Sequence, residues 1–144
     1  MTPLNPHYEE VIQAIFSQAG FISELGIRLH DLGPGWCETD LVITPRHMQQ
    51  NGFIHAGVQA SMADHTAGAA AATLMPEAKI VLTVEFKINL LRPAVGERLR
   101  CRADVVKPGK TISFVEAVVY ALQNEEAKLV SKLVTTMTFV SVQP

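Results

Sequence analysis

The stretch QQNGFIHAGVQASMADH, residues 49–65, decides the fold that this sequence predicts. It opens as a polar loop in which Asn51-Gly52 is a strong turn signal. An alanine-rich run without proline follows, and alanine is the strongest helix former. Pro76 ends this run, because proline cannot continue a helix and disfavours the helical conformation in the residue before it. The stretch therefore predicts one long helix over residues 56–75.

Two polar side chains interrupt a helix that is otherwise built to be buried. Val58 and Met62 lie one turn apart on it, and its many alanines allow neighbouring backbone to approach closely. Asp64 lies in the middle of the helix, and His55 lies at its entrance. A buried carboxylate costs free energy unless a partner or a reaction uses it. Asp64 is therefore either a paired carboxylate in the core or at an interface, or a functional group.

The flanking sequence predicts an antiparallel sheet and an N-terminal helix. Residues 5–19 predict this helix, which Asn5 caps and Gly20 ends. Short turns separate consecutive strands, so the sheet is antiparallel and the long helix packs on it. The expected fold is α+β, in one domain over residues 1–144. The strands are expected as an antiparallel pair within residues 21–43 and as four single strands over 80–91, 98–107, 111–122 and 128–142.

The strand at residues 80–91 shows a clean period of two. Leu82 and Val84 fall on an apolar face, whereas Thr83 and Glu85 fall on the opposite, polar face. Simple alternation therefore predicts that Thr83 points away from the apolar side of the sheet.

Composition and charge exclude several functional classes. With a net charge of -2, the chain lacks the basic surface that phosphate contacts with nucleic acid require. It has no apolar run long enough to span a membrane, and its first residues lack the basic and apolar regions of a secretory signal. Cys37 and Cys101 are interpreted as buried free thiols, not as a disulfide or a metal site. We expect a cytoplasmic protein with no nucleic-acid or membrane partner.

The segment GFIHAG, residues 52–57, followed by Asp64, resembles the signature of the PaaI-like acyl-CoA thioesterases of the phenylacetate pathway. That signature has Asn, Gly and then His-Gly-Gly at a helix start, with an acidic residue nine positions after the His, as from His55 to Asp64. A strand ending in Pro93 and the turn Gly109-Lys110-Thr111 are also similar to the family. The likeness covers residues 26–140. It implies the hotdog fold, an antiparallel sheet around one central helix, and hydrolysis of acyl-CoA thioesters.

The resemblance implies a role for each matching position. Asp64 would act as the general base that activates water, or as the nucleophile. The backbone N–H of Ala56 or Gly57 would polarise the thioester carbonyl. His55 would brace the helix start, and Thr83 would help to hold the water.

Two positions depart from the family pattern. Ala56 replaces the first Gly after the His, which keeps a backbone donor and adds a methyl group to the site. Gln49 stands where the family has Asn, six residues before the His, and Asn51 lies two residues later. Gln49 is thus the candidate for orienting the carbonyl, and Asn51 is a candidate substrate contact.

A basic turn is the candidate contact for the phosphates of coenzyme A. The alternative is a solvated turn with no ligand. The residues concerned are Lys107, Gly109, Lys110 and Thr111.

The chemistry of thioester hydrolysis predicts an oligomer. The reaction needs a donor for the developing oxyanion and a base for water. The unpaired N–H groups of a helix start supply the donor, and Asp64 supplies the base. Ala56 and Asp64 lie roughly 12 Å apart along one helix, so one carbonyl cannot meet both. We therefore expect a homodimer, or a dimer of dimers, in which Asp64 of one chain faces the helix start of another.

The sequence is also compatible with other functions. A non-hydrolytic acyl-CoA or acyl-carrier binding protein on the same fold is the alternative, and a hotdog dehydratase is a third possibility. His55, Asp64 and His65 do not share a helical face, so no metal site is expected. No cofactor is expected either, because coenzyme A is part of the substrate.

Overall fold

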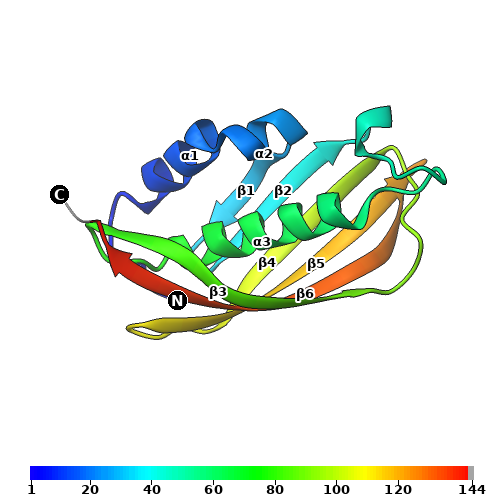
Figure 1. Cartoon of the computed structure of the whole chain (residues 1–144). Coiled ribbons are helices and arrows are strands. Elements are labelled where there is room, and N and C mark those ends of the chain that lie inside the picture. Colours follow the sequence, from blue (N-terminus) through cyan, green and yellow to red (C-terminus); the bar gives the residue numbers. More distant parts are fainter. Residues whose placement is uncertain (143–144) are drawn as a thin grey trace.

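The computed structural model describes residues 1–142 and has the α+β architecture that the sequence predicts (Figure 1). Helices α1 (Tyr8–Gln18) and α2 (Gly20–Leu25) come first, followed by the hairpin of β1 (Arg28–Gly33) and β2 (Trp36–Val42). A 3-10 turn, Pro45–His47, leads to the long helix α3 (Ala56–Ala72). The remaining strands are β3 (Lys79–Leu90), β4 (Arg98–Lys107), β5 (Ile112–Gln123) and β6 (Glu126–Ser141).

One antiparallel sheet holds these strands in the order β1-β2-β4-β5-β6-β3, so β3 lies at a sheet edge. Figure 1 shows the sheet curving around α3, which packs against every strand from β2 to β6. Helices α1 and α2 lie against α3, and α1 also contacts β1. This arrangement is the hotdog fold. Within residues 1–142, none of the helices is long and apolar enough to cross a membrane.

The core lies between α3 and the concave face of the sheet. Met62, Ala63 and Ala67 of α3 are fully buried against strand residues such as Leu99 and Leu133. The small side chains let the sheet approach the helix closely, as the alanine-rich sequence predicts. Two cysteine thiols are free and lie in this core, in agreement with the prediction of buried free thiols. Burial raises the pKa of each thiol to about 12. The thiols are those of Cys37 and Cys101.

Helix α3 ends at Ala72, before the predicted end at residue 75. The hydroxyl of Thr73 donates to the Ala70 carbonyl at 2.7 Å and accepts the N–H of Gly35 at 2.8 Å. The next two N–H groups bond to carbonyls three residues back, so the chain tightens into a 3-10 turn before Pro76.

Helix α1 ends at Gln18, close to the predicted end before Gly20, but a second helix, α2, follows that the sequence analysis did not predict. Gly20 is the first residue of α2, and Gly26 ends that helix with φ 84°. The N–H of Gly26 closes the last turn on the Ile22 carbonyl at 3.1 Å. Helices commonly end at a left-handed glycine of this kind, and here that glycine is Gly26, not Gly20. The predicted strand pair consequently begins only at Arg28.

A β-bulge in β3 overturns the predicted faces of this strand. Thr83 pairs with Met137 and Glu85 pairs with Thr136, so Val84 is an extra residue on β3. Directly opposed residues of antiparallel strands share a face. Met137 is fully buried beneath α3, so Thr83 lies on the helix side of the sheet. The alternation placed Thr83 on the opposite face from the apolar positions around it because it assumed an unbroken ladder.

Candidate active site

The loop before α3 is held by its own backbone and by Gln49. The N–H of Gln49 donates to the Phe53 carbonyl at 2.8 Å, and the N–H of Gly52 returns to the Gln49 carbonyl at 3.2 Å. The side-chain carbonyl of Gln49 accepts the N–H groups of Asn51 and Phe53. Its amide group is thus the part of Gln49 that can donate to a substrate carbonyl. Asn51 is exposed at the turn.

His47 anchors this loop to the rest of the molecule, a role that the sequence analysis missed. Its ring is buried, and Nε2 lies 2.6 Å from the Leu25 carbonyl at the end of α2. Its Nδ1 accepts the N–H of Thr44 at 3.0 Å, and its carbonyl accepts the N–H of His55 at 2.9 Å. The position of the helix start therefore depends on a side chain well before it in the sequence.

Helix α3 begins with His55 as its N-cap. Nδ1 of His55 accepts the N–H of Gly57 at 2.8 Å, so His55 braces the helix start as expected. The N–H of Ala56 has no acceptor among residues 1–142. This N–H lies at the positive end of the helix dipole, where a developing negative charge is stabilised. The structure thus separates the two candidate donors, because Gly57 closes the cap and Ala56 faces outward.

Asp64 and Thr83 meet across the gap between α3 and β3. The Thr83 hydroxyl donates to Oδ1 of Asp64 at 2.7 Å and lies 3.4 Å from Sδ of Met137. Asp64 is half-buried on α3, and Thr83 reaches it because of the bulge in β3. Two of the predicted site residues are therefore brought together by a feature that the alternation pattern did not reveal.

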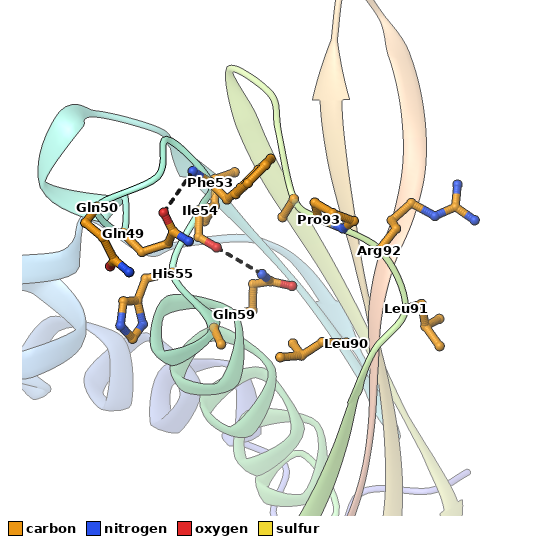
Figure 2. A pocket seen from close by; sticks show the side chains of 12 residues that line it. Gln49, Gln50, Phe53, Ile54, His55, Gln59, Leu90, Leu91, Arg92 and Pro93 are labelled. Atoms are coloured by element: carbon orange, nitrogen blue, oxygen red, sulfur yellow. Dashed lines mark hydrogen bonds between the residues drawn. The ribbon is translucent and has the colours of Figure 1, made fainter.

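The helix start and the carboxylate open into different cavities. A cavity of about 650 Å³ lies between the loop and residues 90–94, with Ala56 and His55 in its wall (Figure 2). A second cavity of about 350 Å³ lies beside Asp64 and Thr83. Within one chain, the structure does not bring Asp64 to the free N–H of Ala56.

Gln59 is a buried polar residue of the first cavity that the sequence analysis did not single out. Its side chain is 3% exposed, and Nε2 donates to the Ile54 carbonyl at 3.3 Å. Figure 2 shows Oε1 directed away from Ile54, and this oxygen has no partner among the described residues. Its position one turn after Ala56, on the buried side of the helix, is the sequence signal that could have identified it.

His65 lies next to Asp64 but takes no part in the Asp64–Thr83 pair. Its ring meets the ring of Phe16 edge-on, with centroids 4.7 Å apart. Burial lowers the pKa of His65, and the neighbouring Asp64 charge opposes this shift only in part. Its imidazole is therefore neutral at neutral pH.

The basic turn between β4 and β5 lies at the far end of the sheet from the loop at residues 49–55 (Figure 1). Lys107, Lys110 and Gly109 are exposed, and the N–H of Gly109 donates to the Ser113 hydroxyl at 3.3 Å. The Thr111 carbonyl accepts the hydroxyl of Thr138 at 2.9 Å. Within one chain, this turn is not part of the cavity at the helix start.

Comparison with known proteins identifies the family. The family model described as "Thioesterase superfamily" matches residues 51–128. Acyl-coenzyme A thioesterase 13 of Homo sapiens is 30% identical over 116 residues, covering 79% of this chain and 82% of that protein. A thioesterase family protein from Silicibacter pomeroyi shares 37% identity and superposes with a TM-score of 0.92, covering 94% of this chain and 99% of that one.

The E. coli PaaI protein of the phenylacetic acid degradation operon shares the fold. It superposes with a TM-score of 0.82 at 17% identity, covering 96% of each chain. Since the family model spans more than half of the chain and carries the His55 and Asp64 segment, this protein belongs to the thioesterase superfamily and is a thioester hydrolase with the hotdog fold.

Proposed function

We propose that the protein is an acyl-CoA thioesterase in which Asp64 activates water and the N–H of Ala56 stabilises the oxyanion. The observation that carries this proposal is the 2.7 Å hydrogen bond from Thr83 to Asp64 at the mouth of an apolar cavity. A half-buried carboxylate held in one orientation by a hydroxyl group is suited to general-base catalysis. The similarity to a protein named acyl-coenzyme A thioesterase supports coenzyme A as the thiol.

The reaction follows from these groups. The water oxygen attacks the thioester carbon while Asp64 accepts a proton from the water. The negative charge moves to the carbonyl oxygen, where the N–H of Ala56 donates to it. Collapse of the tetrahedral intermediate breaks the C–S bond, and the departing coenzyme A thiolate takes up the proton that Asp64 accepted, which restores the Asp64 carboxylate. Thr83 donates to Oδ1 and so directs the other carboxylate oxygen toward the water.

The proposed active unit is a homodimer that shares its sites. Ala56 and Asp64 lie roughly 12 Å apart on one helix, so the base must come from a second chain. The edge strand β3 offers a surface for that chain, since its apolar side chains remain exposed: Leu82 by 49%, Val84 by 57% and Phe86 by 44%. A long apolar edge of this kind is unusual on a monomer. Two-fold pairing along β3 sets the two α3 helices antiparallel and creates two equivalent sites. Such dimers can pair again into a dimer of dimers.

Further expectations follow from this proposal. The basic turn with Lys107 and Lys110 is our candidate contact for the phosphates of coenzyme A, outside the cavities. The free buried thiols suit a reducing compartment and support a cytoplasmic location.

A thiol-release assay over a panel of acyl-CoAs tests the function. The wild type should release coenzyme A, and Asp64→Asn should retain the fold while kcat falls about 100-fold or more, as expected for loss of a general base. Acyl-CoA binding without any release by the wild type would instead identify a binding protein on this fold. Turnover near the wild-type rate in a folded Asp64→Asn protein would remove Asp64 from the mechanism.

A further inference from the structure

The cavity beside Asp64 is lined by two helices and two strands. Helix α1 contributes Val11 and Ile15, and helix α3 contributes Gly68 and Ala69. Strands β3 and β6 complete the wall, mainly with apolar side chains such as Met137. The polar groups at the cavity are Asp64, Thr83, His65 and Lys79. The cavity is thus an apolar space with the carboxylate on its wall.

The two cavities differ in polarity, so each suits a different part of an acyl-CoA: one the pantetheine arm and the other the acyl group. The wall of the cavity at the helix start combines apolar side chains with the polar ones of Gln49, Gln50, Gln59 and Arg92, which can bond to the amides of the pantetheine arm. The cavity beside Asp64 suits an apolar group, because its burial there removes hydrocarbon from water. Since Asp64 activates the water that attacks the carbonyl carbon, the carbonyl must lie next to this second cavity.

We propose that the cavity beside Asp64 binds the acyl group, and that Gly68 and helix α1 limit its length. This proposal rests on the proposed function. An apolar cavity of about 150 Å³ holds the six carbons of benzene. At the same density, a volume of about 350 Å³ holds roughly 14 carbon atoms. The substrate class is an acyl-CoA with an unbranched or aryl-terminated apolar acyl group of up to that size.

Gly68 is the position at which the cavity can be changed with least disturbance. Gly68 lies one turn after Asp64, so both residues face the cavity from the same side of α3. A Cβ added at Gly68 would meet Val81 Cγ1 at 3.9 Å, an ordinary contact, and no other neighbour within 4 Å. Replacing glycine inside a helix also improves helix propensity. A larger side chain at this position therefore fills the cavity without breaking the fold.

The test is the dependence of kcat/KM on acyl length for acetyl-, butanoyl-, octanoyl-, dodecanoyl- and hexadecanoyl-CoA. In the wild type, kcat/KM should rise by up to about fourfold for each buried methylene and then fall beyond roughly 14 carbons. Gly68→Leu should lower kcat/KM for dodecanoyl-CoA at least about tenfold while acetyl-CoA changes less than about threefold. Gly68→Ala is the graded comparison: its smaller side chain should lower kcat/KM for dodecanoyl-CoA less than Gly68→Leu does. Ile15→Ala removes part of the cavity wall that α1 contributes, so the acyl length with the highest kcat/KM should shift toward hexadecanoyl-CoA.

The failures of the two proposals are distinct. A wild type that hydrolyses none of the panel contradicts the proposed function. A wild type that hydrolyses acyl-CoA, with Gly68→Leu lowering kcat/KM equally for every length or not at all, contradicts the acyl pocket. If Ile15→Ala leaves the dependence of kcat/KM on acyl length unchanged, α1 does not limit the length of the acyl group.

Discussion

Replacing Thr83 by valine should slow catalysis without weakening substrate binding. The change removes the hydroxyl that donates to Asp64 at 2.7 Å and keeps the branched shape of the side chain. Hydrogen bonds to charged groups contribute about 1.5–3 kcal/mol, but Thr83 is exposed, so solvent reduces the value here to about 1–2 kcal/mol. That range corresponds to a decrease in kcat of about 5- to 30-fold.

The assay is steady-state thiol release with one good acyl-CoA substrate, comparing Thr83→Val with Thr83→Ser. Serine keeps the hydroxyl, so it should retain most of the wild-type kcat, whereas valine should lower kcat with KM nearly constant. Thr83 thus orients the base and does not bind the substrate. A valine variant with the wild-type kcat would refute this role, and so would a serine variant that loses as much activity as the valine variant.

Two further predictions concern the helix start and the neighbour of Asp64. Ala56→Gly should keep kcat/KM within about threefold of the wild type, because the donor is a backbone N–H. Ala56→Val should lower kcat/KM more than about tenfold, because its side chain crowds the substrate carbonyl. Normal hydrolysis by the valine variant would exclude this oxyanion site. The pKa of His65 is lowered in the folded state. As the pH falls below the ordinary value of 6.5, the unfolded state therefore binds the proton before the folded state does, and the free energy of unfolding decreases. His65→Gln should therefore lose less thermal stability than the wild type between about pH 7.5 and about pH 5, and identical slopes of Tm against pH would contradict the assignment.

The parts of the fold that depend on composition and period could be predicted from the sequence. The alanine-rich run and Pro76 identified α3 as the central helix, and the alternating segments identified the strands after it. The start of α3 at Ala56 also followed from the sequence, because a polar turn precedes the helix formers directly. These signals are local, so one chain carries them without reference to the rest of the molecule.

The parts that depend on tertiary contacts could not be predicted. The bulge at Val84 arises from pairing with β6, and without it Thr83 was assigned to the wrong face. The choice between Ala56 and Gly57 as donor depended on whether His55 uses one of them, which only the geometry reveals. Gln59 carries no motif, and its importance comes from its burial beside a cavity.

The central claim is that each active site combines Ala56 of one chain with Asp64 of another, and complementation tests it most directly. Asp64→Asn subunits are mixed with Ala56→Trp subunits, each inactive alone, and subunit exchange is verified by co-purification through two different tags. In a mixed dimer one site carries both changes and the other carries neither. Random exchange of equal amounts should therefore restore about one quarter of the wild-type activity. Verified exchange without any return of activity, or a stable monomer with full activity, would contradict the shared site.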